Sequence, residues 1–205
     1  MKFLHYLLPV TFSLLIATFA ILPDYLGIPF WGLFNAGILA WAITQLPLKS
    51  SQINAILWIC LHELLTALLG LQFNPIMTAI IVLSFVYIEK GKDFWAAFFI
   101  VLGVFIKLYG IVGLAFFFFS RNKIKFILSL FLWSVVLFTL PMLISSPEYI
   151  IQTYQEWFAR LIEKNNENTG LSSYQDISLM GMVRRFFQDS SIPNLPFLIS
   201  GVFLF

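Results

Sequence analysis

One lysine interrupts a long apolar stretch of the sequence, and its type and position could do chemistry. Lys107 lies in the run of residues 94–119, where nearly every other side chain is apolar or aromatic. A lysine inside a membrane span costs about 2.5 to 3.5 kcal/mol on insertion scales unless its ammonium finds water or a partner. Three interpretations are open: Lys107 binds a phosphate, forms an ion pair with Glu63, or snorkels to the membrane surface.

Two amide side chains stand in a turn between apolar runs and could line a binding site. Gln72 and Asn74 occupy this turn, and the parity of the spans places them on the same side of the membrane as Lys107. Their amides could hydrogen-bond a sugar or a phosphate. Asn74 could equally cap the helix that begins with Pro75, which suits a first helical position. Both interpretations stay open on the sequence alone.

An adjacent pair of ionisable residues lies inside another apolar run. His62 and Glu63 resemble part of a zinc-protease motif, in which a second histidine follows four residues after the first. The sequence has Thr66 at that position, so the motif is incomplete. We therefore expect no metal site here, and we expect His62 and Glu63 to form a polar core pair.

Two arginines follow a long polar stretch at residues 145–193. Arg184 and Arg185 could anchor to lipid headgroups, or they could clamp a lipid phosphate through their forked guanidinium groups. The sequence has no glycine-rich phosphate loop, no nucleophile elbow and no cluster with metal-ligand spacing. The residues alone therefore indicate anion binding in a polar cavity.

The composition places these residues in a membrane protein. Of the 205 residues, 60% are hydrophobic, 18% aromatic and 11% charged, with a mean hydropathy of +0.91. Soluble domains carry about 25% charged residues, and the disordered, collagen-like and disulfide-stapled classes have other compositions. The net charge of +2 is too small and too scattered for a nucleic-acid surface. The single cysteine, Cys60, cannot form an intrachain disulfide.

Apolar runs of about 20 residues bounded by polar turns predict membrane-spanning helices. We expect one membrane domain over residues 1–205 with an all-α fold, a polytopic transmembrane helical bundle. The last run would reach only about half of a bilayer, so we expect the chain to be a fragment of a longer protein. The runs are 3–22, 28–46, 53–71, 75–88, 94–119, 126–144 and 195–205.

The run that contains Lys107 predicts a hairpin. Lys90 and Lys92 precede it, and three further basic residues follow at 121–125. The positive-inside rule favours the cytoplasm for both flanks, which a single span cannot satisfy. A re-entrant helical hairpin that turns near residues 107–110 returns the chain to its starting side. Because such a turn lies within the membrane, protein or a watery cavity must surround it.

The polar stretch at 145–193 predicts an external amphipathic helix. Ser146 can cap it, Pro147 suits its first position, and Glu148 complements the helix dipole. Apolar residues then recur at helical spacing, as in helices that lie on a membrane surface. We expect a loop at 164–170 and a second short helix that begins near Ser178.

The order of several short segments resembles glycosyltransferase family 87. The segments are Gly-Leu-Gln-Phe-Asn-Pro at 70–75, the run that contains Lys107, and Arg-Asn-Lys at 121–123. A further segment at 176–181 resembles the family's Asn-Gln-Ser-Leu-like loop, although Asp176 stands in place of the asparagine.

This resemblance implies a fold of the GT-C type and a membrane glycosyltransferase. Its donor would be a hexose, mannose in this family, on a polyprenyl-phosphate carrier, and its acceptor a glycan or glycolipid at the external face. We expect no cofactor; dependence on a divalent metal is open. The expected location is the cytoplasmic (inner) membrane of a bacterium. The alternatives are a transporter or flippase for an anionic lipid or solute, and a non-catalytic membrane subunit.

The resemblance also assigns roles to residues. An acidic general base is expected in an external loop upstream of this chain, so we expect the fragment alone to be inactive. The catalytic residue is therefore unknown. The donor phosphate would contact Lys107 and Arg184, and the substrate would be lined by Gln72, Asn74, Asp176 and Ser178.

Overall fold

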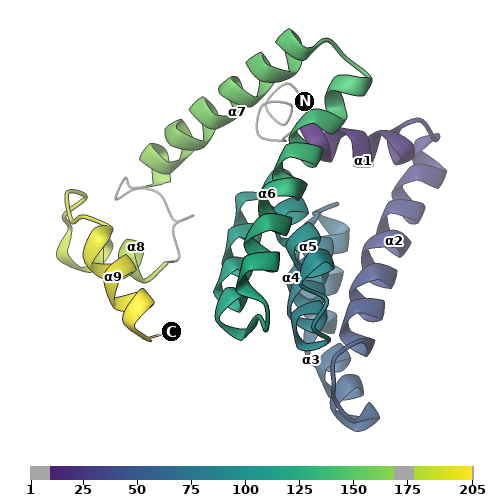
Figure 1. Cartoon of the computed structure of the whole chain (residues 1–205), viewed down its shortest axis with the longest axis horizontal. Helices are drawn as coiled ribbons and strands as arrows, with labels where there is room; N and C mark the ends of the chain where they lie inside the picture. The colour runs from purple at the N-terminus through teal and green to yellow at the C-terminus, as the bar shows by residue number, and fades with distance from the viewer. Residues whose placement is uncertain (1–9, 169–177, 205) are drawn as a thin grey trace. The chain divides into compact units, whose positions relative to one another are not determined.

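The computed structural model describes residues 10–168 and 178–204, and every regular element in these ranges is a helix. The prediction of an all-α fold is confirmed (Figure 1). The helices are α1 (Val10–Ala20), α2 (Asp24–Thr44), α3 (Ser50–Leu69), α4 (Asn74–Glu89), α5 (Asp93–Ile106), the 3-10 helix η1 (Leu108–Phe119), α6 (Lys123–Thr139), the 3-10 helix η2 (Leu140–Leu143), α7 (Pro147–Asn168), α8 (Leu179–Phe187) and α9 (Leu195–Leu204).

The chain divides into two compact units. Helices α1 to α6, with η1 and η2, form the first, which we refer to as the core unit. Most of α7, with α8 and α9, forms the C-terminal unit. Three stretches of the described chain are long and apolar enough to cross a membrane: α2, α3, and α6 together with η2.

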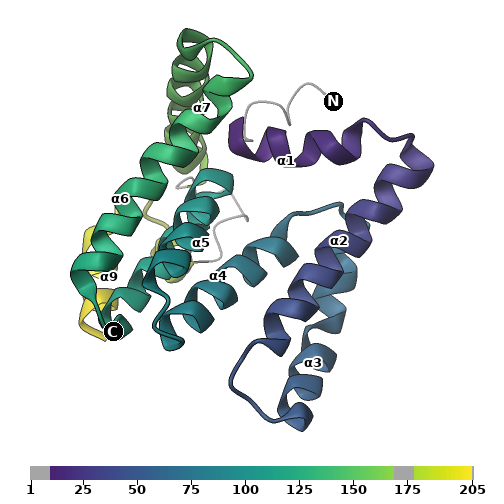
Figure 2. The ribbon, with the colours of Figure 1, turned by 45° about the vertical axis from the view of Figure 1, so that its right-hand side comes forward.

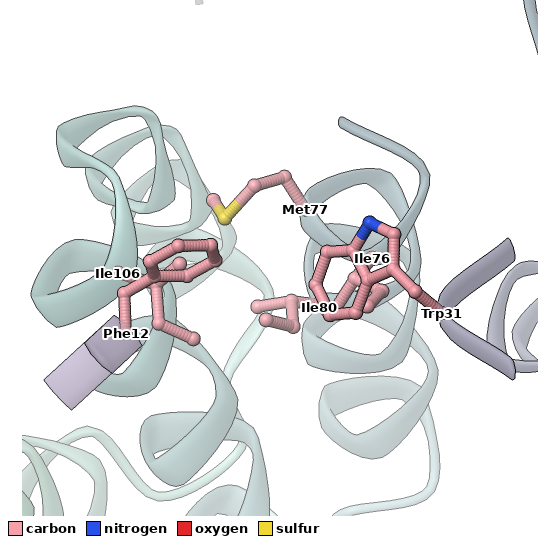
Figure 3. Close-up of a cluster of buried hydrophobic side chains, with 6 residues drawn as sticks. All are labelled: Phe12, Trp31, Ile76, Met77, Ile80 and Ile106. Carbon is pink, nitrogen blue, oxygen red and sulfur yellow. The ribbon is translucent and has the colours of Figure 1, made fainter. Parts of the chain in front are cut away.

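Helix α4 is the centre of the core unit and packs between α2 and α5 (Figure 2). Helix α2 presents Trp31, Asn35 and Leu39 toward this core, a spacing of four residues that keeps them on one helix face. The largest shared cluster joins four helices, α1, α2, α4 and α5 (Figure 3). Its buried side chains are Phe12, Trp31, Ile76, Met77, Ile80 and Ile106.

Helix α3 has the opposite character, because Ala67 is its one buried residue. Large apolar side chains such as Trp58 and Ile59 are more than three-quarters exposed. A helix of 20 residues covers about 30 Å, the thickness of a bilayer core. This exposed apolar surface is therefore suited to contact lipid chains or further protein within a membrane.

The predicted helical hairpin is confirmed, with α5 and η1 as its two arms, while its re-entry into one side of a membrane stays a prediction. A Cβ atom on Gly110 would lie 2.3 Å from the carbonyl carbon of Gly103, and one on Gly113 would lie 2.8 Å from Cγ1 of Ile100. Gly110 of η1 thus lies opposite Gly103 of α5, and Gly113 lies opposite Ile100, so the chain runs in opposite directions in the two arms. Glycine is required at the closest approach because any side chain would overlap the opposite backbone. The second arm is a 3-10 helix, a difference from the predicted α-helix.

A buried polar contact closes the base of the hairpin. The hydroxyl of Ser120 donates a hydrogen bond of 2.8 Å to Oδ1 of Asp93, and both residues are buried. Their neighbours in sequence carry the basic flanks, so these flanks lie at the same end of the hairpin. That this end faces the cytoplasm stays a prediction.

Helix α6 packs along the hairpin and is fixed there by tryptophan. The indole Nε1 of Trp133 donates to the carbonyl oxygen of Phe94 at 3.1 Å, and its ring contacts those of Phe94 and Phe98. Phe126 is fully buried under the base of the hairpin. The predicted run at 126–144 therefore exists, divided into α6 and the short η2.

Helix α7 begins at Pro147 as predicted and continues further than expected. The loop predicted from 164 is wrong for its first part, because the helix extends to Asn168. Oppositely charged residues three positions apart stabilise helices modestly, and two such pairs occupy the last turns. They are Arg160–Glu163 at 2.6 Å and Lys164–Glu167 at 3.1 Å.

Candidate functional site

The structure brings three of the predicted site residues together at the tip of the hairpin. Nζ of Lys107 donates a hydrogen bond of 3.0 Å to Oδ1 of Asn74. Nδ2 of Asn74 in turn donates to Oε1 of Gln72 at 2.6 Å. Lysine and two amides thus form a chain of hydrogen bonds that joins the tip of the hairpin to the start of α4.

Lys107 occupies the break between the two arms of the hairpin. Its backbone is extended, with φ −155° and ψ 128°, so α5 ends at Ile106 and η1 starts at Leu108. Its N–H still donates to the carbonyl oxygen of Gly103 at 2.8 Å, which keeps the turn attached to α5. The lysine side chain therefore projects from a fixed turn.

The α3–α4 turn positions the two amides. Leu71 has a positive φ of 50°, and the N–H of Gln72 donates to the carbonyl oxygen of Ala67 at 2.8 Å. This pattern closes the last turn of α3 in the manner of a Schellman motif. Asn74 is then the first residue of α4, followed by proline. Asn74 thus begins the helix, while its side chain bonds to Lys107 instead of capping the α4 backbone.

An aromatic anchor holds this turn on the core unit. Phe73 stands between the two amides in sequence, and its ring lies 5.8 Å from that of Trp31 and 4.9 Å from that of Phe12, centroid to centroid. Aromatic pairs of this kind contribute about 0.5–1.5 kcal/mol beyond their buried area. Gln72 and Asn74 are therefore presented from a rigid support.

The partners of the Lys107 ammonium are all neutral. Besides the amide oxygen of Asn74, the ammonium lies 4.8 Å from the centroid of the Tyr109 ring. Within the described residues, no carboxylate forms an ion pair with Lys107; both ion pairs of this part of the chain lie in α7. The structure therefore does not support the alternative in which Lys107 forms an ion pair with Glu63. The ammonium of Lys107 is thus half-buried beside neutral groups, an arrangement that an anionic ligand could complement.

The predicted polar core of His62 and Glu63 is corrected by the structure. Both side chains are exposed on α3, because that helix turns only Ala67 into the core unit. The sequence could not reveal this, since the whole of α3 is apolar enough to have been buried. Within residues 10–168 and 178–204, no three potential metal-ligating side chains come together.

Arg184 belongs to the C-terminal unit and is buried there. Its guanidinium donates two hydrogen bonds to the carbonyl oxygen of Ile192, at 3.0 and 2.8 Å, and another to Oδ1 of Asn194. These contacts tie α8 to the start of α9. The proposed contact of Arg184 with a donor phosphate stays a prediction.

The remaining predicted residues lie on the N-terminal side of α8. The short helix begins near Ser178 as expected, and Oγ of Ser178 caps it by accepting a hydrogen bond of 3.1 Å from the N–H of Gly181. Its predicted contact with substrate stays a prediction. Asp176 lies outside the described residues.

Three polar or aromatic features were not predicted from the sequence. Tyr109 lies against Lys107, and Asp93 pairs with Ser120 at the other end of the hairpin. Asn35 is fully buried in α2, where its Nδ2 donates to the carbonyl oxygen of Trp31. Asp93 and Ser120 stand almost equally far in sequence from the turn at Lys107. The predicted hairpin could therefore have indicated that they lie opposite each other.

Fold and site together define the class of protein. Three stretches of the described chain are apolar and long enough to span a membrane, and one of them, α6, packs along a hairpin that carries Lys107 at its tip. These are the features of an integral, polytopic membrane protein. The chain belongs to glycosyltransferase family 87, whose family model matches residues 6–205. The resemblance noted in the sequence is thereby confirmed, and the family assigns membrane glycosyltransferase activity. No curated protein and no solved structure matches the chain.

Proposed function

We propose that this glycosyltransferase moves a hexose, mannose in the simplest case, from a polyprenyl-phosphate carrier to a glycan or glycolipid acceptor. The reaction would take place at the external face of a bacterial cytoplasmic membrane, with Lys107 bound to the donor phosphate. One observation supports this most strongly. The ammonium of Lys107 is fixed at the tip of a hairpin by neutral partners, Asn74 and Tyr109, which leave its charge uncompensated.

The chemistry of the donor explains why such a cation is useful. As the glycosidic bond breaks, negative charge grows on the phosphate oxygen that stays with the carrier. An ammonium held beside this oxygen in a water-poor site stabilises that state more than it would in bulk water. Lys107 would thus favour departure of the carrier phosphate, and Asn74 would keep the ammonium in place. Gln72, at the exposed end of the hydrogen-bond chain, would line the space for the donor.

Lys107→Met tests this role, because methionine preserves much of the stem and removes the charge. We expect turnover to fall by about 10² or more, the range found when one electrostatic donor is lost from an active site. Lys107→Arg should retain part of the activity if the ligand is a phosphate, since arginine also binds phosphate. The assay is transfer of radiolabelled mannose from polyprenyl-phosphate mannose by the full-length enzyme in proteoliposomes.

Lys164→Met is the matched control for loss of a lysine. Lys164 lies on α7 and pairs with Glu167 at 3.1 Å, so its loss should leave turnover near wild type. Turnover of Lys107→Met close to wild type would refute the phosphate role. Movement of the labelled lipid across the membrane without sugar transfer would instead support the flippase alternative.

A further inference from the structure

One end of the core unit gathers exposed basic side chains from several helices. Nζ of Lys90 donates to Oε1 of Gln45 at 3.3 Å and joins the end of α4 to the end of α2. The pair of Asp93 and Ser120 joins the start of α5 to the end of η1, and α6 begins just beyond. We refer to this end as the basic end. Its exposed basic residues are Lys49, Lys90, Lys92, Arg121, Lys123 and Lys125.

Two turns of the basic end lie side by side, which concentrates its charge. Gly91, with a φ of +65°, forms the α4–α5 turn, and a Cβ atom there would be 4.0 Å from Cδ of Arg121. Arg121 stands in the η1–α6 turn. The contact therefore brings the cations on either side of the hairpin base into one surface, although they are distant in sequence.

No ion pair is formed by the basic residues of this surface within the described chain, and although Glu89 is an exposed carboxylate at the end of α4, the six cations leave a net positive charge. The ion pairs of the described residues lie in α7, and Asp93 is buried against Ser120. The lysines contact aromatic rings instead: Nζ of Lys92 lies 5.9 Å from the centroid of Tyr87, and Nζ of Lys123 lies 5.8 Å from that of Phe117. These contacts place neutral rings beside the two ammonium groups and leave their positive charge in place.

We propose that the basic end is a binding surface for anionic phospholipid headgroups. The helices that carry it belong to a membrane protein, so their ends meet the headgroup layer, where phosphate groups are concentrated. Each lysine or arginine near an anionic membrane surface contributes about 1 kcal/mol of attraction. The opposite end of α4 and α5 carries Lys107 with its amides, so the core unit is electrically asymmetric. This surface would therefore also orient the protein, independently of the donor that it uses.

The test measures the preference of the protein for an anionic lipid over a neutral one. In proteoliposomes, spin-labelled phosphatidylglycerol should associate more strongly than spin-labelled phosphatidylcholine. The double variant Lys92→Gln/Lys123→Gln should weaken this preference by about fivefold per lysine, or roughly 30-fold in total, from about 1 kcal/mol each. The control, Lys164→Gln, removes a lysine of α7 whose charge is already paired with Glu167 at 3.1 Å, and it should leave the preference unchanged.

Two further measurements on the wild type distinguish a lipid headgroup from a soluble anion as the ligand. At about 1 M salt, where the Debye length is about 3 Å, the preference of the wild type should fall sharply. Free inorganic phosphate at the same ionic strength as a chloride control should make no additional difference. Equal association of both lipids at low salt, or a preference that the double variant retains, would overturn the proposal. Specific competition by free phosphate would also overturn it and would indicate a soluble ligand.

Discussion

Replacing Asn74 by aspartate would exchange the side-chain amide for a carboxylate and test why Lys107 has a neutral partner. Oδ1 of Asn74 lies 3.0 Å from Nζ of Lys107, so aspartate would place a carboxylate directly against the ammonium. The amide of Gln72, which now accepts from Asn74, can rotate and donate to the new carboxylate. The variant should therefore fold, with a stronger contact between α4 and the hairpin tip.

The magnitude follows from the geometry of the pair. Two unit charges about 4 Å apart attract by about 4 kcal/mol at an effective dielectric constant of about 20, whereas exposed pairs gain about 1 kcal/mol or less. Lys107 is half-buried, and an intermediate value of about 2 kcal/mol is appropriate. A donor phosphate would have to compete with this pair, so its affinity should fall by roughly 30-fold.

The assay is the KM of the full-length enzyme for polyprenyl-phosphate mannose in proteoliposomes, together with the thermal stability of the variant. Asn74→Leu serves as a comparison, because it removes the acceptor without compensating the charge, and it should raise KM far less. Gln45→Glu is the matched control: Gln45 accepts from Lys90 at 3.3 Å, the same kind of pair at the other end of α4. It should leave the donor KM unchanged.

The two interpretations of Lys107 predict different results. If the contact with Asn74 only holds the fold together, Asn74→Asp should raise stability and leave the donor KM as it was. That outcome would refute the reasoning that the site preserves an uncompensated cation for a phosphate.

Three further predictions concern the hairpin and its surroundings. Gly110→Ala should destabilise the protein by about 3 kcal/mol in thermal unfolding, because its Cβ would lie 2.3 Å from the opposite backbone, whereas Gly37→Ala, with nothing within 4 Å, should be nearly neutral. Leu71→Gly should stabilise the protein by about 1 kcal/mol, because leucine there adopts a φ of +50°; a lower melting temperature would contradict this. Single cysteines in place of Lys92 and Lys123 should be labelled from the same side of intact membranes. Labelling from opposite sides would show that residues 94–119 cross the membrane once and are not re-entrant.

Sequence reasoning succeeded where a residue type carries its own local geometry. Ser146 caps α7 and Pro147 begins it, because serine and proline are specifically suited to those positions. Lys107 marked the turn of the hairpin, because a cation and the basic flanks were incompatible with a single apolar span. Its proximity to Gln72 and Asn74 followed in outline from the parity of the spans.

The rest depends on tertiary contacts that no single segment encodes. The exposure of His62 and Glu63 is set by the packing of α3, which turns only Ala67 inward. The close approach of Gly103 and Gly110 is a distance between two segments, which the residues of either segment alone do not indicate. Tyr109 lies in the site because the backbone angles of the turn direct its ring to the ammonium of Lys107.

The lengths of α4 and α5 have a consequence for the lipid around them. Their 16 and 14 residues correspond to about 24 and 21 Å, less than the hydrocarbon thickness of about 30 Å. With the basic end held at one headgroup layer, Lys107 would lie several ångströms below the opposite one. Such hydrophobic mismatch is relieved when the bilayer thins beside the short helices. Local thinning of this kind would bring the phosphate of a long isoprenoid lipid to the depth of Lys107 while the tail of the lipid remains in the membrane.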